Sequence, residues 1–551
     1  STIGYGFFII RMLKFNDFDY NYGLVGILGL FTLSVVAGLT HLFFPHNYIH
    51  NLVIIILGIL NFVFFNKKKF REFKHLFIIF SLLFICLLMS KTNEDFGYYH
   101  LPNSLQFAQQ KLQFGLGNLN HGFKHISSLF MIMSLHYLPI IEYYLFNLAN
   151  FLFLTFFVMF VLSEIYLKNN KNLSLSNIIL SLILVLFLTK FSRLAEFGSD
   201  ISGQIIISIY FFYFLEFFYN DKVYLKKRIE YLKLSLILIV FAISLKFILV
   251  IYSFLIFISF YSILKKREII FTLLKIDYLI IIILPLTIFI FFNFSSTGCL
   301  IYPVEITCFS NTFDWALKSE TINNLNFHYE IWAKGGRGPG VSVIDEKDYI
   351  MNFNWFKNWL NIYFIGKFSD YLLVVISIII VFSSFFFKEI FIDKNKLKNN
   401  NFHFLLLYFF LIIIFLLWFL NFPTLRYAGY LIVFLLFVFP FSIIVMKRIN
   451  FTKKNVIKKI SIIFLISYSI FFFKNVSRIN SELNLSEIEH NNFKNFPLFW
   501  VHKKNFEKIE VNGHPLYLTD GKCWNVPTTC VRSLYKLEIK KTNNYIFYKN
   551  R

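Results

Sequence analysis

Long apolar stretches alternate with short clusters of Lys, Arg and Asn along almost the whole chain. An apolar stretch of about 20 residues can cross the hydrocarbon core of a bilayer as an α-helix. Several stretches here are shorter, so their boundaries stay open. The pattern predicts an all-α polytopic membrane protein of about thirteen transmembrane helices, over 24–44, 51–65, 76–91, 139–167, 177–190, 203–219, 233–245, 247–264, 276–293, 371–387, 403–420, 427–446 and 460–473.

The segments between the predicted helices differ strongly in length and charge. Basic clusters such as the one in 66–75 fall in short segments on one side, and the long segments 92–138, 294–370 and 474–551 fall on the other. Cytoplasmic loops are enriched in Lys and Arg, which predicts a cytoplasmic N-terminus and an extracytoplasmic C-terminus. We therefore expect a membrane domain over 1–473 and a small extracytoplasmic domain over 474–551.

One stretch tests this orientation. Residues 233–264 could form a single long tilted helix, which would reverse the side of every later loop and place Lys265, Lys266 and Arg267 outside. Two short helices that meet at Lys246 fit the charge distribution better, because the basic residues then stay inside.

Composition supports the membrane interpretation. Of 551 residues, 57% are hydrophobic and only 15% are charged, which excludes an ordinary water-soluble domain. A net charge of +23 in a soluble protein would suggest nucleic-acid binding. In a polytopic chain it is explained by basic cytoplasmic loops, so we expect membrane lipids and no nucleic acid as partners.

The cysteines give an independent check of the orientation. Four of them form two close pairs in the sequence, Cys299 with Cys308 and Cys523 with Cys530. Both pairs fall on the predicted extracytoplasmic side, where disulfides persist. Cys86 lies within a predicted helix and is expected to be a small apolar residue there.

The first candidate site follows the third predicted helix. Glu94 and Asp95 are adjacent carboxylates, with Tyr98, Tyr99 and His100 just beyond them. Either the two acids are solvated loop residues, or they provide a general base or metal ligand that faces a cavity, with His100 as a helper.

Isolated charges at the same membrane depth form the second candidate site. Arg193 and Asp200 lie in the short segment before 203–219, and Lys246 and Arg426 each stand alone between two apolar stretches. The cations either extend to the membrane interface or bind a lipid phosphate, which an Arg guanidinium contacts with two hydrogen bonds. Asp200 either caps the following helix or belongs to the site.

Two features of the long loops carry further expectations. Residues 97–114 have a helical apolar spacing, which predicts an amphipathic helix at the membrane interface. Aromatic residues of 294–370 either stack on sugar rings or anchor the loop at the interface. These residues are Trp315, Tyr329, Trp332, Trp355 and Trp359.

The chain resembles the GT-C superfamily of polytopic glycosyltransferases, which use polyprenyl-phosphate-linked sugars, and more closely an uncharacterised bacterial multipass family. The residues that carry the resemblance are EDFGYYHLP at 94–102, FGLGNLNHGFKHISSLF at 114–130, FGSD at 197–200, SLKF at 244–247, STGCLIYPV at 296–304, FPTLRYA at 422–428 and GKCWNVPTTC at 521–530.

The resemblance implies roles for several of these residues. Asp95, with Glu94 beside it, corresponds to the acidic residue of the first large outer loop, which acts as the base or holds a divalent metal ion. Asp200 matches the second acidic position loosely, and Arg193, Lys246 or Arg426 would contact the donor phosphate. One departure is that two predicted helices precede the one that carries this loop, where the usual pattern has one.

The function expected from these features is a membrane glycosyltransferase of the bacterial inner membrane. It would transfer a sugar from a polyprenyl-phosphate donor to a cell-envelope glycan or glycolipid on the periplasmic face. The alternatives are an enzyme like an O-antigen polymerase or ligase, a lipid or solute transporter, and a scaffold without catalytic activity. A transporter should carry charges midway through its helices, whereas here they cluster at the outer ends.

Overall fold

A computed structural model gives the fold. It describes residues 1–15, 20–65, 70–90, 95–167, 173–193, 197–219, 224–264, 267–337, 341, 343–387, 401–448, 453–489, 496–502, 504–535, 537–542 and 545–550. The statements below refer to these residues.

The chain is mostly helical, as the apolar pattern predicts. The α-helices are α1 (Thr2–Met12), α2 (Tyr22–His41), α3 (Tyr48–Phe65), α4 (Phe70–Leu83), α5 (Leu101–Gln109), α6 (Ser128–Ser134), α7 (Leu148–Leu162), α8 (Leu175–Lys190), α9 (Gly198–Tyr219), α10 (Leu225–Leu245), α11 (Phe254–Leu264), α12 (Arg267–Leu273), α13 (Ile276–Thr297), α14 (Ser319–Ala333), α15 (Glu346–Ile350), α16 (Phe356–Asn358), α17 (Ser369–Phe385), α18 (Asn401–Asn421), α19 (Tyr430–Arg448) and α20 (Lys453–Glu489).

Short 3₁₀ or π-helical segments extend or connect these helices. They are η1 (Phe84–Cys86), η2 (Phe96–His100), η3 (Leu116–Asn118), η4 (His121–Lys124), η5 (Tyr143–Leu145), η6 (Ser163–Leu167), η8 (Phe247–Ser253), η9 (Glu305–Thr307), η10 (Met351–Phe353), η11 (Trp359–Phe368) and η13 (Leu425–Gly429).

Nine helices within the described residues are long and apolar enough to cross a membrane. The protein is therefore a helical membrane protein. Four further predicted spans lie on helices that are shorter or more polar: 76–91 on α4 and η1, 177–190 on α8, 233–245 on α10, and 247–264 on η8 and α11. α8 is apolar but has only 16 residues, and α10 begins with the charged stretch LKKRIEYLK.

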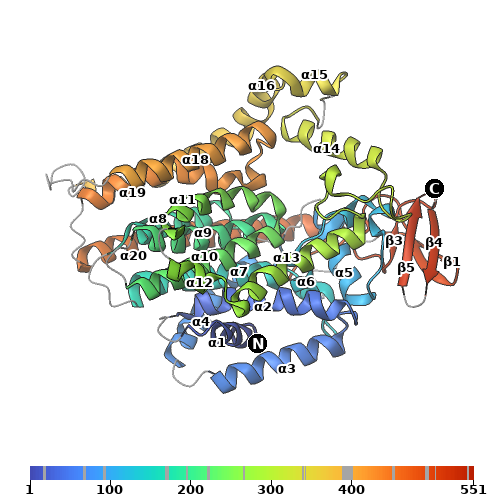
Figure 1. Cartoon of the computed structure of the whole chain (residues 1–551), viewed down its shortest axis with the longest axis horizontal. Helices are drawn as coiled ribbons and strands as arrows, with labels where there is room; N and C mark the ends of the chain where they lie inside the picture. The colour runs from blue at the N-terminus through green and yellow to red at the C-terminus, as the bar shows by residue number, and fades with distance from the viewer. Residues whose placement is uncertain are drawn as a thin grey trace.

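The long helices lie roughly side by side along the longest axis of the molecule (Figure 1). α9 is at the centre, since every residue from Gly198 to Phe217 is buried. α3 lies at the perimeter and buries only Asn51, Ile54 and Gly58. Its remaining apolar side chains include exposed Ile49 and Val63, as expected of a helix that faces lipid tails.

Two helices, α1 and α5, differ from the expectation. α1 lies in a segment expected to be a cytoplasmic tail, yet it packs tightly on α3, and a Cβ at Gly4 would lie 1.9 Å from the carbonyl oxygen of Gly58. α5 was predicted as an interfacial amphipathic helix, but all residues from Leu101 to Ala108 are buried. The predicted helix is present, but its placement at the membrane interface is wrong, because its polar side chains bond to other protein groups: the Gln106 amide donates to Gln113 at 2.8 Å.

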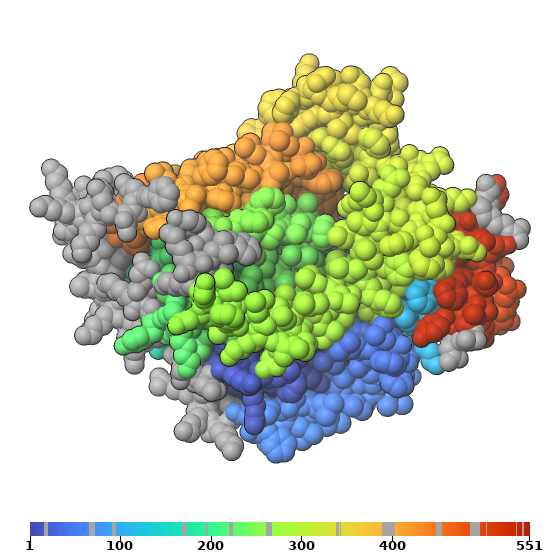
Figure 2. All heavy atoms as spheres, viewed as in Figure 1, coloured from blue at the N-terminus to red at the C-terminus, as the bar shows by residue number. Residues whose placement is uncertain are grey.

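The strands all lie in the C-terminal segment and gather at one end of the helix bundle (Figure 1). β1 (Glu507–Val511) pairs antiparallel with β2 (His514–Leu518), and β2 pairs with the short β3 (Cys530–Val531). β4 (Leu537–Thr542) and β5 (Tyr545–Asn550) form an antiparallel hairpin. Figure 2 shows the 294–370 segment, in yellow-green and yellow, covering one face beside these strands.

Both predicted disulfides are present. Cys299 is bonded to Cys308, and Cys523 to Cys530. Cys86 is free and buried, as expected of a small residue within a helix. The Cys523–Cys530 loop contacts the segment between α4 and α6, since the backbone N–H of Trp524 donates to the carbonyl of Gly97 at 2.9 Å. This loop therefore holds η2, at whose start Asp95 lies.

Candidate functional site

Four charged side chains from distant parts of the sequence form one ionic network. Asp200 accepts a hydrogen bond from Lys246 and another from Nε of Arg426 at 3.0 Å. The Nη2 amino group of the Arg426 guanidinium donates to a carboxylate oxygen of Asp95. The order of contacts is Lys246, Asp200, Arg426, Asp95, so positive and negative charges alternate.

Local backbone geometry places each member of the ionic network. Asp200 lies in the first turn of α9, which begins at Gly198 with φ +46°. A Cβ at Gly198 would lie 2.2 Å from the His100 ring, so only glycine fits this approach. Lys246 is extended, where α10 ends and η8 begins. This break agrees with two helices rather than one over 233–264.

Arg426 is held at a kink before α19. Within η13, Ala428 has φ +69°, and its carbonyl accepts a hydrogen bond from the Tyr252 hydroxyl at 2.9 Å. The Lys246 ammonium lies 4.7 Å from the centre of the Tyr427 ring, a cation–π distance. Tyr427 therefore packs against the same network that Arg426 completes.

The ionic network is shielded from solvent to different degrees. The side chain of Asp200 is only 4% exposed, whereas that of Asp95 is 25% exposed. Burial alone would raise the pKa of Asp95, but the guanidinium of Arg426 outweighs it, and the pKa lies below its usual value. Asp95 is therefore ionised at neutral pH.

Three of these residues line a large cavity. It has a volume of about 900 Å³, and its wall includes Asp95, Lys246 and Arg426, together with Tyr98 and Tyr99. Asp200 lies behind this wall. The volume is within the range of pockets that bind drug-sized ligands, about 300 to 1,000 Å³. The cavity can thus hold a ligand against two cations and a carboxylate.

Histidines and tyrosines line another part of the cavity wall. The Tyr329 hydroxyl lies 2.9 Å from Nε2 of His121 and 3.2 Å from Nε2 of His125. The Tyr302 hydroxyl lies 3.3 Å from that of Tyr329. Burial lowers the pKa of His121 to about 4 and that of His125 to about 3, so both rings are neutral at neutral pH. The Tyr98 ring stacks on His121.

Tyr98 was predicted as a site residue and Tyr329 as one of the loop aromatics, whereas His121, His125 and Tyr302 were not assigned a site role from the sequence. The signal was present in the stretch HGFKH, where His121, Lys124 and His125 recur at a helical spacing of three and four residues. Trp332, another of those aromatics, also lines the cavity, whereas Trp355 and Trp359 pack on Phe419.

Two further predicted site residues, His100 and Arg193, lie outside the cavity wall. His100 is buried against Tyr99 and Phe130, and burial lowers its pKa to about 4, so it positions neighbours as a neutral ring. Arg193 is exposed after the end of α8 and is not part of the wall. Glu94 lies outside the described residues.

The carboxylates and histidines around the cavity do not gather into a metal site within the part of the chain that the structure describes. The described residues contain no group of three or more His, Cys, Asp or Glu side chains that could hold a metal ion. Arg426 bridges the two carboxylates of Asp95 and Asp200, in the place that a shared cation would take. The described donor set therefore does not fit a divalent ion, and no step below depends on one.

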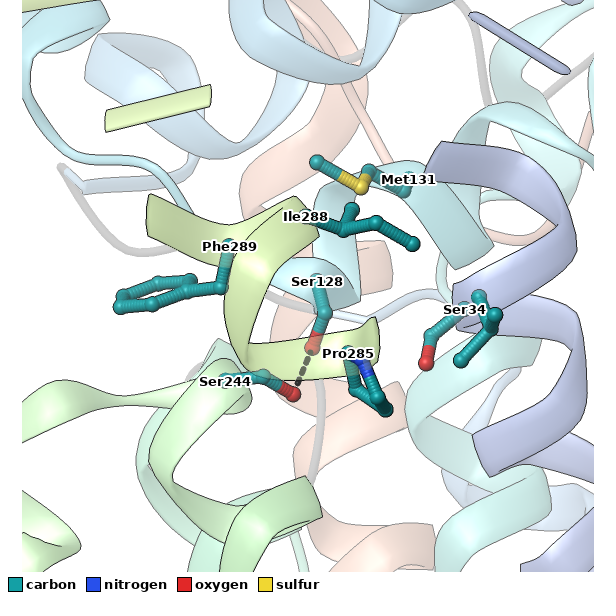
Figure 3. A pocket seen from close by; sticks show the side chains of 8 residues that line it. Ser34, Ser128, Met131, Ser244, Pro285, Ile288 and Phe289 are labelled. Carbon is teal, nitrogen blue, oxygen red and sulfur yellow. Dashed lines mark hydrogen bonds between the residues drawn. The ribbon is translucent and has the colours of Figure 1, made fainter. Parts of the chain in front are cut away.

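A second cavity is far too small for a substrate. It lies between α2, α6, α10 and α13 beside Pro285, and has about 10 Å³, close to the space of one water molecule. Figure 3 shows Ser128 and Ser244 facing each other there, with their hydroxyl oxygens 3.0 Å apart. This cavity marks the break that Pro285 makes in the packing of α13.

Comparison with protein-family models gives one match. A family described as "Domain of unknown function (DUF8201)" matches residues 1–433, which include the whole ionic network. No curated protein and no solved structure matches the chain significantly.

Proposed function

The chain belongs to the DUF8201 family, and we propose that it is a glycosyltransferase of a bacterial inner membrane. The donor is a sugar linked to polyprenyl phosphate, and the acceptor is a cell-envelope glycan or glycolipid. The proposal includes thirteen spans, a cytoplasmic N-terminus and a periplasmic site, where a lipid-linked donor replaces nucleotide sugars. The observation that carries it is the meeting of Asp95, Lys246 and Arg426 on the wall of the 900 Å³ cavity.

The reaction is an inverting transfer. An acceptor hydroxyl attacks the anomeric carbon of the donor while the bond from that carbon to the phosphate oxygen breaks. Asp95 takes the hydroxyl proton as a general base. Arg426 and Lys246 stabilise the phosphate as its negative charge grows, because donors aimed at developing charge act strongly in a site shielded from water.

Phosphate binding would also prepare the base. In the ligand-free protein Arg426 pairs with Asp95 and keeps its pKa low, which makes the carboxylate a weak base. A donor phosphate on Arg426 competes for the same guanidinium and offsets its positive charge. The pKa of Asp95 then rises toward the range in which a carboxylate accepts a proton more readily.

The aromatic wall suits a saccharide. Tyr98, Tyr329 and Trp332 present rings and hydroxyl groups to the cavity. Aromatic faces stack on apolar sugar faces, and uncharged hydroxyl and imidazole groups bond to sugar hydroxyls. This combination supports a sugar substrate over a purely apolar solute.

The test is turnover by the purified protein in lipid nanodiscs with a panel of polyprenyl-phosphate sugars. We expect the parent to release polyprenyl phosphate, and Asp95→Asn and Arg426→Gln to lower the rate at least 100-fold. Asp314→Asn, which changes an exposed acid outside the site, is the matched control and should retain full activity.

Turnover that survives Asp95→Asn removes the proposed base. If the parent turns over no donor in the panel but moves a fluorescent polyprenyl-phosphate lipid between leaflets, the protein is a transporter instead.

A further inference from the structure

Lys124 is a buried cation on the cavity wall. It ends η4, its side chain is 9% exposed, and it lines the cavity. Within the described part of the chain no hydrogen bond or ion pair to its ammonium is present. Its methylene stem packs beside Gly117, where an added Cβ would lie 3.2 Å from Cγ of Lys124.

The groups near Lys124 do not offset its charge. His121 and His125, whose pKa values are lowered mainly by burial and further by the charge of Lys124, are neutral rings at neutral pH. The carboxylates of Asp95 and Asp200 are already paired with Arg426. Burial lowers the pKa of Lys124 to about 8, so at pH 7 the amine is still mostly protonated.

An unpaired ammonium in such a place is costly. Moving a charge out of water without a partner is strongly unfavourable, and buried charges in proteins are normally paired. A ligand that brings its own negative charge would remove this cost on binding. Lys246 and Arg426 already have protein partners, so Lys124 differs from both in having its charge available.

We infer that Lys124 forms a second oxyanion subsite, which pairs with a phosphate or carboxylate group carried by a saccharide. The neutral His121, His125 and Tyr329 beside it supply hydrogen bonds without competing for the charge. The assignment to a saccharide rests on the proposed function, whereas the oxyanion chemistry rests on Lys124 itself. The cavity would thus contact its ligands at two separate anionic positions, one at Arg426 and Lys246 and one at Lys124.

The experiment measures the reactivity of the Lys124 amine directly. The full chain in phosphatidylcholine nanodiscs is treated with acetic anhydride at pH 8, and acetylation of each lysine is followed by mass spectrometry. Glucose 6-phosphate, glucuronate, inorganic phosphate and neutral glucose are compared at equal concentration. Exposed Lys111 is the internal control.

We expect glucose 6-phosphate or glucuronate to slow acetylation of Lys124 at least fivefold, and glucose to leave it unchanged. Lys111 should react at one rate throughout. Equal protection by inorganic phosphate supports a site that recognises the oxyanion. Protection by added phosphatidylglycerol without any sugar would assign the oxyanion to a lipid and overturn the saccharide assignment.

Other outcomes overturn the inference. Reaction of Lys124 at one rate under all conditions excludes an anion there, and a Lys124 that the reagent never reaches does not face the cavity.

A second experiment uses variants. Glucose 6-phosphate should raise the thermal midpoint of the parent and of Lys124→Arg, but not that of Lys124→Met. Lys111→Met is the matched control. Because labelling needs no turnover, protection without glycosyl transfer would leave the subsite standing and remove the proposed function.

Discussion

Removing Asp200 should destabilise the protein through the charges that it leaves behind. Asp200 is 4% exposed and bonds both Lys246 and Arg426. Breaking a buried ion pair on one side costs about 3 to 5 kcal/mol, because the other charge stays buried without a partner. Arg426 keeps Asp95 and Lys246 keeps the Tyr427 ring, so we expect the lower end, about 3 kcal/mol, for Asp200→Asn.

Lys246→Met removes the other member of the ion pair between Lys246 and Asp200. Lys246→Met leaves Asp200 paired with Arg426, so we expect a smaller loss of about 2 kcal/mol, the value of a hydrogen bond to a charged group. If the residues acted independently, the double variant would lose about 5 kcal/mol. We expect only about 3 kcal/mol, because removing Lys246 also removes the cation that Asp200→Asn leaves unpaired.

The free energy of unfolding is measured by titration with sodium dodecyl sulfate in mixed micelles, followed by circular dichroism. Lys14 and Asp277 form an exposed ion pair at 3.4 Å, with side chains 75% and 59% exposed. Asp277→Asn, Lys14→Met and the double variant of this exposed pair should each lose less than about 1 kcal/mol of the free energy of unfolding. Additive losses at Asp200 and Lys246, or losses no larger than in the exposed pair, would refute the ionic network.

Three further outcomes follow from the site. Gly198→Ala should lose more than about 2 kcal/mol of the free energy of unfolding in the same titration. Gly198 has φ +46°, and the new Cβ would meet the His100 ring. An unchanged midpoint would contradict this. Cys523→Ser with Cys530→Ser should cost about 2.5 kcal/mol for a loop of seven residues and lower turnover through η2; an unchanged free energy of unfolding would contradict this. The pKa of Asp95 is lowered in the folded state, so its stabilising contribution is present above the unfolded pKa of about 4 and is lost as the pH falls through the folded pKa. The stability gap between the parent and Asp95→Asn should therefore narrow as the pH falls below about 4.

The sequence could predict that the site residues share one side of the membrane domain, but not their contacts. Orientation by basic loops places Asp95, Lys246 and Arg426 at the outer ends of helices, and the structure brings them together. The pairing of Arg426 with Asp95 joins residues 331 positions apart. Such a contact depends on how η2 and η13 pack beside the start of α9, and periodicity within one helix carries no information about its neighbours.

α5 and Lys124 show where the sequence pattern misleads. The residues Leu101 to Ala108 alternate apolar and polar as a surface helix does, yet all are buried, because the polar side chains bond to other protein groups instead of water. Lys124 was overlooked for the opposite reason. A lysine in a loop is normally solvated, and only its 9% exposure in the structure shows that it is not.

The ionic network itself explains why Asp95 is the better candidate for the base than Asp200. The two carboxylates share Arg426, so an arriving phosphate competes with both for one guanidinium. Asp200 keeps a second cation, Lys246, and stays paired when Arg426 turns to the ligand. Among the described residues Asp95 has no second cation in bonding contact, and it faces the cavity. In the proposed reaction, phosphate binding would therefore free Asp95 alone, at the moment when a base is needed beside the donor.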